Sequence, residues 1–410
     1  MYSVEDIRKQ FPMLNGKTMQ GKPLIYLDNA ATTFKPQVVI DEITKYYTTF
    51  TANSHRGDYD LTYSVDVAVG NAREKIAKFV NCEVNEVVFT SGDTAGLNLI
   101  AWGYGLKHLK KGDEVIISEA EHASNFIPWI KVCELTGATI KFMPLSEDGR
   151  LTVENLRKTI NKNTKIVSLA HVGNVFGFIA DMKSFAKIAH EYGAIIVCDG
   201  AQSVPHMKTD FKELDIDFLT FSAHKMCGPT GIGALIGKYN LLLDTDPFIT
   251  GGGMNITFDK ACNVEPSLPP AKFEAGTLDL AGIVGFGKCI DFLTEIGMDN
   301  IHEHEKELVQ YLNKRLENNE NIIVYNKNAE CGIFTFNIKG IFAQDEATLL
   351  NSKGIAVRSG LHCAKALVDY LGVPGTVRLS VYLYTSKDEI DAFIDAINEG
   401  GDILDAYFLN

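Results

Sequence analysis

Short apolar runs recur along the chain from residue 26, and longer amphipathic stretches separate them. These runs have the length and composition of buried strands; they lie at residues 86–90, 114–118, 165–170, 194–198 and 218–221. Strands that alternate with helices in this way are typical of a mainly parallel sheet covered by helices. The pattern therefore predicts an α/β fold for the larger part of the chain.

The pattern changes near residue 285. A long charged helix is predicted over 301–317, and strands follow at residues 332–338, 355–358 and 376–383. At the start of the chain, Ser3 is a suitable cap for a short helix over 4–10. We interpret the chain as an N-terminal arm that packs on the small domain, a large sheet domain and a smaller α+β domain, at residues 1–25, 26–285 and 286–410.

The composition is that of a globular protein with a small-molecule substrate. A chain of 410 residues, 46% of them apolar, can fill two hydrophobic cores. The net charge of -13 disfavours nucleic acid or an anionic membrane as a partner. No apolar run approaches the roughly 18 residues of a membrane span, and the first residues are polar and acidic, unlike a signal peptide. We therefore expect a cytoplasmic protein.

Metal-binding patterns are not found in the sequence. The eight cysteines are scattered and form no C-x-x-C pair, which indicates neither a disulfide framework nor a zinc site. His302 and His304 lie two residues apart in a predicted helix, where such side chains do not share a face. We therefore expect no metal site.

Polar residues gather where the predicted strands end. The polar segments that follow the five strands lie at residues 91–94, 119–125, 171–174, 199–202 and 222–225. Because ligands of such sheets bind at the carboxyl ends of the strands, we expect these segments to meet at one edge.

Lys225 and Asp199 indicate a specific chemistry at this edge. Lys225 precedes a glycine-rich run over 228–233, and Asp199 follows a strand that reads as buried. An enzyme that uses pyridoxal 5'-phosphate (PLP) needs a lysine for a Schiff base and an acid that keeps the pyridine nitrogen protonated. Gln202 has an amide that can donate to the phenolic oxygen. An aspartate in this position is otherwise a common turn or helix cap.

The dianionic phosphate of PLP needs hydrogen-bond donors. Thr94 and the amides of residues 92–94 open a predicted helix, where unpaired N–H groups favour an anion. Ser222 and His224 can donate to the same group, and His122 offers a flat ring that can stack on the cofactor. Taken singly, an ordinary capped helix and a structural loop histidine are alternative interpretations of these residues.

Asn174 and Arg378 are candidates for binding a substrate carboxylate. Arg378 lies between Val377 and Leu379 in a predicted strand, so its side chain projects opposite the apolar face and can form a bidentate pair. A surface or salt-bridged arginine is the alternative interpretation.

Cys363 is the candidate nucleophile. It follows a predicted strand, and Gly360 permits a sharp turn before it, which predicts an accessible thiol. Most cysteines are inert, but Arg358 and His362 are neighbours that can favour the thiolate.

Together these segments resemble the class V aminotransferase-fold cysteine desulfurases, specifically the group II, SufS-like branch that also includes selenocysteine lyases. The matching segments span nearly the whole chain, at residues 26–33, 55–57, 121–129, 171–174, 199–202, 221–233, 273–277 and 358–364. The resemblance implies a PLP-dependent transferase of fold type I, with a mainly parallel sheet in the large domain and a smaller α+β C-terminal domain.

The resemblance also implies how the cofactor is held. Lys225 resembles the Schiff-base lysine, Asp199 the pyridine partner and Gln202 the phenolate donor. His122 resembles the residue that stacks on the ring and carries a proton. The remaining cofactor ligands are implied to surround the phosphate: Thr94, Asp93, Ser222, His224 and, from the other subunit of a homodimer, Thr277.

By the same resemblance, Cys363 takes the sulfur of L-cysteine as a persulfide and L-alanine is released. Asn174 and Arg378 resemble carboxylate ligands, and Arg358 and His55 resemble active-site neighbours. The family implies that the sulfur passes to an acceptor protein of the SufE or SufU type, for iron-sulfur cluster assembly.

The chain departs from the family pattern at several positions. Asp93 and Ala95 stand where a small or hydroxyl residue and a glutamate are usual, and Gly173 replaces a common serine. A carboxylate beside a phosphate is unfavourable unless its side chain turns away, so Asp93 bears on cofactor affinity. Residues 365–366 and 384–386 also differ from the customary ones, which bears on acceptor recognition.

Other activities remain open at this point. A selenocysteine lyase or a cysteine sulfinate desulfinase would use the same residues, with L-selenocysteine as an alternative substrate. A class V aminotransferase or epimerase shares the fold but does not need Cys363. A non-catalytic scaffold of a sulfur pathway would bind PLP weakly, and its purified form would be colourless.

Overall fold

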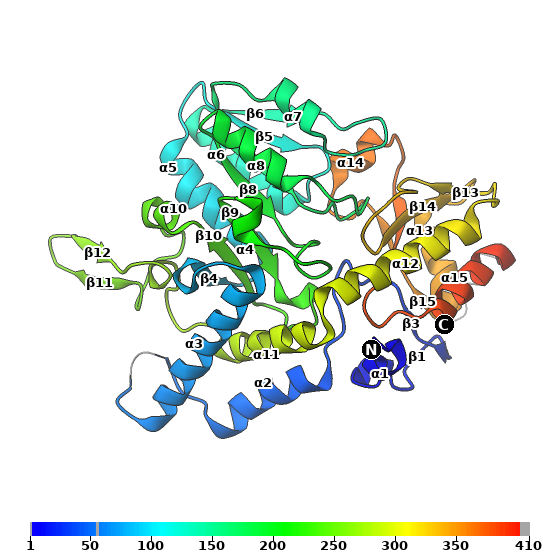
Figure 1. Cartoon of the computed structure of the whole chain (residues 1–410), viewed down its shortest axis with the longest axis horizontal. Coiled ribbons are helices and arrows are strands. Elements are labelled where there is room, and N and C mark those ends of the chain that lie inside the picture. The colour runs from blue at the N-terminus through cyan, green and yellow to red at the C-terminus, as the bar shows by residue number, and fades with distance from the viewer. Residues whose placement is uncertain (1, 55–56, 402–410) are drawn as a thin grey trace.

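A computed structural model describes residues 2–54 and 57–401 of the chain (Figure 1). The larger body is built on a seven-stranded sheet in the order β4-β10-β9-β8-β7-β5-β6. Its strands are β4 Val87–Thr90, β5 Glu114–Ser118, β6 Thr139–Met143, β7 Thr164–Ala170, β8 Ile195–Asp199, β9 Phe218–Ser222 and β10 Gly233–Gly237. The strands from β9 to β6 are parallel, and β10 is antiparallel to both of its neighbours. The predicted α/β fold with a mainly parallel sheet is confirmed.

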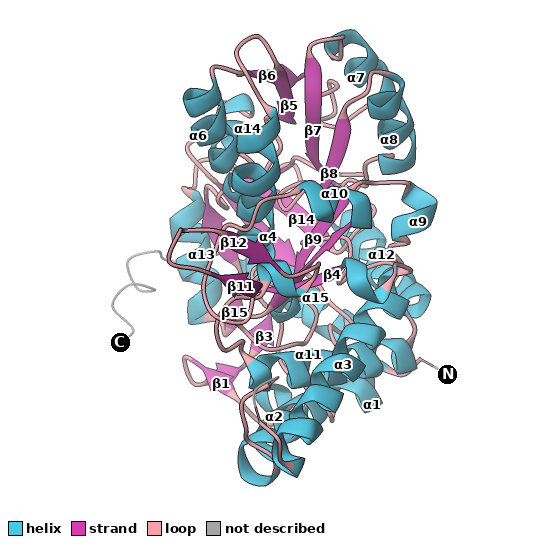
Figure 2. Ribbon diagram, turned by 90° about the vertical axis from the view of Figure 1, so that its left-hand side faces the viewer, coloured by secondary structure: helices cyan, strands magenta, loops and turns pink. Residues whose placement is uncertain are grey.

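Helices cover both faces of this sheet. Figure 2 shows the strands between α6 on one side and α7 and α8 on the other. The helices of this body are α2 Gln37–Thr49, α3 Asp60–Val80, α4 Asp93–Leu99, α5 Leu106–His108, α6 Ile127–Thr136, α7 Val153–Thr159, α8 Met182–Glu191, α9 Phe211–Leu214, α10 Tyr239–Asp244 and α11 Leu280–Ile296.

The strands are apolar on both faces because each face lies against a core. In β5, Ile116 packs into one core, while Val115 and Ile117 point to the opposite face and pack into another. Strands buried on both faces read as continuous apolar runs, which is why these segments were recognisable in the sequence.

The C-terminal part holds a four-stranded antiparallel sheet in the order β13-β14-β17-β16. Its strands are β13 Ile322–Val324, β14 Ile333–Ile338, β16 Arg358–Gly360 and β17 Thr376–Ser380. The helices around it are α12 Met298–Leu316, α13 Ala343–Ser352, α14 Lys365–Tyr370 and α15 Lys387–Glu399. A separate apolar core unites this sheet with α12, α13 and α15.

The N-terminal segment joins the two bodies. It contains α1 Val4–Arg8 and the short strands β1 Thr18–Met19, β2 Lys22–Pro23 and β3 Ile25–Tyr26. Arg8 forms an ion pair with Glu389 of α15 at 2.7 Å, and β3 pairs in parallel with β15 Ile355–Ala356. Phe11 is fully buried against Phe292 and Tyr384.

Several predicted boundaries need correction. The predicted strand at 355–358 is two strands, β15 and β16, and the strand predicted to reach residue 383 ends at Ser380. The sequence did not predict β6 or β10, and α11 is a helix of its own that runs through position 285. The division into residues 1–25, 26–285 and 286–410 stays a prediction.

Some classes of site can be examined in the described residues. No helix within 2–54 or 57–401 combines the length and the apolar character that a membrane span requires. In those same residues, no three His, Cys, Asp or Glu side chains gather closely enough to hold a metal ion. All eight cysteines are free thiols, and Cys262 and Cys363 are exposed.

Candidate active site

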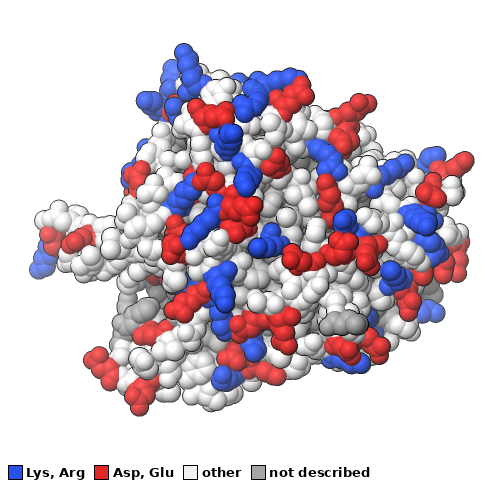
Figure 3. Space-filling view, in the orientation of Figure 1, with Lys and Arg blue, Asp and Glu red and all other residues white. Residues whose placement is uncertain are grey.

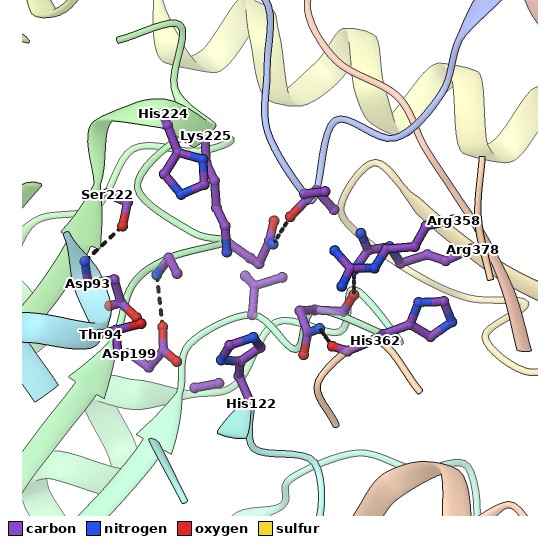
Figure 4. A pocket seen from close by; sticks show the side chains of 17 residues that line it. Asp93, Thr94, His122, Asp199, Ser222, His224, Lys225, Arg358, His362 and Arg378 are labelled. Carbon is purple, nitrogen blue, oxygen red and sulfur yellow. Dashed lines mark hydrogen bonds between the residues drawn. The ribbon is translucent and has the colours of Figure 1, made fainter. Parts of the chain in front are cut away.

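A cavity of about 190 Å³ lies where the carboxyl ends of the large-sheet strands face the C-terminal sheet (Figure 4). Most of the predicted site residues line it together: Asp93, Thr94, His122, Asn174, Asp199, Gln202, Ser222, His224, Lys225, Arg358 and Arg378. The expectation that separate strand ends deliver polar groups to one edge therefore describes this cavity well.

Lys225 and Asp199 line the same cavity from neighbouring strand ends. Lys225 ends the short turn Ala223–Lys225 after β9, and Asp199 is the last residue of β8. One oxygen of the buried Asp199 carboxylate accepts a hydrogen bond from the Ala201 amide at 3.0 Å. Burial lowers the pKa of the Lys225 amine, while the carboxylates of Asp93 and Asp199 oppose this effect. The amine is therefore more readily deprotonated than an ordinary lysine, as a nucleophile requires.

Gln202 is buried beside the cavity with part of its amide unused. Its Nε2 donates to the Ala30 carbonyl at 2.8 Å, while Oε1 is buried and has no partner among the described residues. One amide hydrogen therefore stays free for a ligand.

Ser222 occupies the position predicted for a phosphate donor. Its Oγ accepts a hydrogen bond from the Asp93 amide at 2.7 Å. The backbone N–H of Asp93 is thus already engaged, and the hydroxyl hydrogen of Ser222 is left to donate to an anion.

A chain of hydrogen bonds links Thr94 to His122. The Thr94 and Ser124 hydroxyls lie 2.7 Å apart, and Ser124 Oγ lies 3.0 Å from His122 Nδ1. His122 Nδ1 also accepts from the Ser124 amide at 3.1 Å, which leaves Nε2 to carry the proton of the neutral ring. Burial lowers the pKa of His122, so the ring is neutral at physiological pH.

The Asp93 side chain lies on the floor of the cavity. Its Oδ1 accepts a hydrogen bond of 2.5 Å from the Thr220 hydroxyl, and the residue is only 6% exposed. Burial, followed by the charge of Asp199, raises the pKa of Asp93 to about 8.

His224 closes the same end of the cavity. Its Nδ1 lies 3.2 Å from Thr32 Oγ1. Burial, followed by the charges of Lys225 and Lys35, lowers the pKa of His224 to about 4. The ring is therefore neutral and acts as a hydrogen-bonding group unless an anion binds beside it.

At the other end of the cavity, Arg358 of β16 and Arg378 of β17 form a direct cross-strand pair. The buried Arg378 donates to Asp28 Oδ1 at 3.0 Å and to the Asn174 carbonyl at 2.9 Å, but its Nε has no partner among the described residues. Arg378 is therefore both salt-bridged and part of the cavity wall. Like charges placed opposite each other on neighbouring strands are destabilising, so the pair favours an anionic ligand.

Asn174 stands beside this pair. Its Nδ2 donates to the His362 carbonyl at 2.8 Å, and its Oδ1 is buried with no partner in the described part of the chain. One N–H of the amide remains available to a carboxylate.

Cys363 is exposed, as predicted, and lies outside the cavity lining. Arg358 Nη2 lies 3.8 Å from its Sγ and also lines the cavity, so one side chain joins the two places. The prediction that His362 favours the thiolate of Cys363 is wrong. That ring is buried, its Nε2 is 3.0 Å from the Thr376 carbonyl, and burial lowers its pKa to about 3, so it carries no positive charge.

Another predicted residue does not line this cavity. Thr277 is exposed on a loop and its hydroxyl lies 3.5 Å from Asn53 Oδ1. His55 falls outside the described residues.

The model of the family described as Aminotransferase class-V matches residues 25–393. This chain belongs to the class-V aminotransferase family. A probable cysteine desulfurase of Halalkalibacterium halodurans is 45% identical over 398 residues, which cover 97% of this chain and 98% of that protein.

Solved structures of two cysteine desulfurases share the fold over nearly the whole chain. The cysteine desulfurase CsdA from Escherichia coli, in an S-sulfonic acid form, is 32% identical with a TM-score of 0.90, covering 97% of this chain and 98% of its own. An apo cysteine desulfurase from Thermococcus onnurineus is 34% identical with a TM-score of 0.92, covering 97% and 99%. The predicted fold type I of PLP-dependent transferases is confirmed.

The sequence did not predict every contact that this class-V aminotransferase uses to build its site. Asp28, the partner of Arg378, lies 350 positions away in the chain. Glu121 lies buried under the His122 loop, where it accepts from Ser118 Oγ at 2.6 Å and from Asn125 Nδ2 at 2.7 Å. The spacing of a serine, a glutamate and an asparagine within eight residues is the only local pattern that could have indicated this network.

Proposed function

We propose that this protein is a PLP-dependent L-cysteine desulfurase that converts L-cysteine to L-alanine and passes the sulfur to Cys363. The proposal is supported by the arrangement of the charged side chains along the cavity and of the cysteine beside it. The cavity has a lysine and a carboxylate at one end and two arginines at the other, and one of these arginines touches an exposed cysteine.

The residues of the cavity fit PLP. Lys225, whose amine has a lowered pKa, would hold the cofactor covalently, and the Asp199 carboxylate would pair with the pyridine nitrogen. Gln202 has an unused amide hydrogen in a buried position, and Ser222 has a free hydroxyl hydrogen. Bound PLP supplies an electron sink for the α-carbon of the substrate.

Residues of this chain carry out the separate steps of the reaction. Arg378 and Asn174 bind the substrate carboxylate, which orients the α-hydrogen and the thiol. The Lys225 amine removes the α-proton as general base, because its pKa is lowered by burial. Asp199 keeps a proton on the ring nitrogen, and the neutral His122 carries protons through Nε2.

The Cys363 thiolate attacks the sulfur of the substrate. A new S–S bond forms while the bond between sulfur and Cβ breaks, and the electron pair of that bond stays with the carbon. Protonation of this carbon gives the methyl group, the protonated Lys225 returns the α-proton to the α-carbon to complete L-alanine, and Cys363 is left as a persulfide. Arg358, 3.8 Å from Sγ, stabilises the thiolate before the attack.

We propose a homodimer and an acceptor protein of the SufE or SufU type as partners. The hairpin β11 Asn255–Phe258 and β12 Val264–Pro266 extends from the body at the left of Figure 1. Ile256, Phe258 and Val264 on this hairpin are exposed, and Figure 3 shows charged atoms mainly toward its tip. These apolar side chains support contact with a second copy, and the exposure of Cys363 supports sulfur transfer to another protein.

Alanine release from L-cysteine tests the function. The wild-type protein, Cys363→Ser and Lys225→Ala are each incubated with PLP and a reducing thiol, and Cys262→Ser serves as the control because it removes the other exposed cysteine. We expect alanine from the wild type and Cys262→Ser only.

The outcomes separate the parts of the proposal. Alanine from Cys363→Ser at the wild-type rate would show that Cys363 is not the nucleophile. No alanine from a wild-type protein that binds PLP would exclude L-cysteine as the substrate, and the same assay would then be run with L-selenocysteine.

A further inference from the structure

Two carboxyl groups lie together on the floor of the cavity. Asp199 ends β8, and its backbone is in register with Thr220 on the parallel strand β9. Residues in register on neighbouring strands place their side chains on the same face, about 5 Å apart. The Thr220 hydroxyl donates to Asp93 Oδ1 at 2.5 Å. Thr220 therefore connects the Asp93 carboxyl to the position of Asp199.

The Asp93 side chain is turned from the nearest phosphate donor toward the sheet. Its backbone amide donates to Ser222 Oγ at 2.7 Å, while its carboxyl accepts from Thr220, two residues earlier on β9. Figure 4 shows Asp93 and Asp199 on the same side of the cavity, below Ser222. A carboxylate beside a phosphate is unfavourable unless its side chain turns away. The Asp93 side chain does turn away, because its carboxyl accepts from Thr220.

We propose that Asp93 is a second acidic group of the cofactor site, which acts with Asp199 to stabilise positive charge on the pyridine ring and on the Lys225 nitrogen. This inference rests on the proposed binding of PLP. It assigns Asp93 to the floor of the site and not to the phosphate, where its neighbours in the loop lie.

In the part of the chain that the structure describes, few charged or titratable groups act on Asp93. Asp199 and Cys198 lie on β8, and Lys225 lies in the turn after β9. Of the charged groups that act on Lys225, Asp93 has the largest effect, followed by Asp199. His122 and His224 line the same cavity and are neutral.

The charge of the pair depends on pH. Burial and the charge of Asp199 raise the pKa of Asp93 to about 8, so without a cofactor Asp93 is mostly protonated near neutral pH. A cationic ring or nitrogen beside them favours the ionised form of Asp93. Conversely, removal of this carboxyl should make the cationic form of the Lys225 nitrogen less stable.

The visible absorbance of bound PLP, titrated against pH, measures this effect without any turnover. In Asp93→Asn we expect the pH midpoint of the absorbance change to fall by roughly 0.5 to 1 unit, because one nearby anion is lost. Asp113→Asn is the control, since Asp113 is also buried but lies before β5, at the opposite edge of the sheet. Its midpoint should equal that of the wild type.

Two further variants test the same effect if Asp93→Asn folds poorly. Asp93→Thr removes the charge and retains a hydroxyl, and it should give the same fall. Thr220→Val leaves the carboxyl but removes its hydrogen bond, which should raise the pH at which Asp93 ionises and so lower the midpoint by a smaller amount. In the double variant Asp93→Asn with Thr220→Val, the second change should add nothing.

The outcomes distinguish this inference from the proposed function. A wild-type protein that shows no visible band with PLP would contradict the proposed cofactor. A normal band with an unchanged midpoint in both Asp93 variants would overturn the role of Asp93 alone, as would weaker PLP binding without any change in the midpoint.

Discussion

Two arginines lie at the end of the cavity opposite Lys225. They carry more positive charge than the neighbouring acidic side chain neutralises. Arg358 and Arg378 are direct cross-strand neighbours, and Asp28 is the acid that accepts from Arg378 at 3.0 Å. Two cations side by side destabilise the sheet unless an anion lies between them. The carboxylate of an amino acid substrate would supply that anion and form a charge-assisted pair.

Replacement of Arg378 tests this carboxylate site. In Arg378→Gln we expect KM for L-cysteine to rise roughly tenfold to one hundredfold, because a hydrogen bond to a charged group contributes about 1.5–3 kcal/mol. Binding of cysteamine, which lacks the carboxylate, is measured by the absorbance of bound PLP and should be equal in variant and wild type. An equal loss of affinity for both compounds would show that Arg378 acts through the structure and not through the carboxylate.

At the residue scale, the sequence predicted which side chains meet but not how they are held. Lys225 and Asp199 follow strands of the large sheet, and this placement alone brings them to one edge, whereas Arg378 reaches the cavity from the C-terminal sheet. The ion pair from Arg378 to Asp28 and the hydrogen bond from Thr220 to Asp93 join segments far apart in the chain. Such contacts depend on how segments far apart in the chain pack together, which no local pattern contains.

At the element scale, the same reasoning explains which strands the sequence predicted. The central strands β7, β8 and β9 are buried on both faces and read as apolar runs. The edge strand β6 has exposed and partly buried residues at its first four positions. β10 begins and ends with glycine, so it reads as a continuation of the glycine-rich turn. Burial and composition, not hydrogen bonding, make a strand recognisable in a sequence.

The loop that holds His122 depends on a buried acid. Glu121 is 1% exposed and accepts hydrogen bonds from Ser118 and Asn125. Burial raises the pKa of Glu121 to about 8, so the folded protein retains a proton that the unfolded chain releases above its ordinary pKa of 4.5. The stabilising effect of this proton is complete below pH 4.5 and is lost as pH rises toward 8.

This linkage predicts how Glu121→Gln changes the pH dependence of stability. Glutamine resembles the protonated acid and has no proton to lose, so the variant should gain stability relative to the wild type between pH 5 and 8, by at most about 1.4 kcal/mol per pH unit. The thermal midpoint of the PLP-free protein is measured across this range, with the exposed Glu134→Gln as control. Parallel profiles for the Glu121→Gln variant and the wild type would contradict the prediction.

At the scale of the whole molecule, the hairpin of β11 and β12 exposes three large apolar side chains and contributes none of them to the core. Phe258 is 73% exposed, and Ile256 and Val264 on the same hairpin are more than half exposed. Thr277, expected to serve the site of a partner, lies on an exposed loop outside the cavity of its own chain. A second copy that buries the hairpin would account for both observations.

Phe258→Asp tests whether this hairpin holds two copies together. In a symmetric dimer the substitution acts twice, and burial of one phenylalanine contributes about 1.5–3 kcal/mol, so the dissociation constant should rise by at least roughly one hundredfold. Light scattering should then show a monomer where the wild type is a dimer. Phe342→Asp, at a similarly exposed site before α13, should remain dimeric. If Thr277 of the partner subunit binds the phosphate, the monomer should also lose PLP faster on dialysis. A Phe258→Asp protein that stays dimeric would place the interface elsewhere.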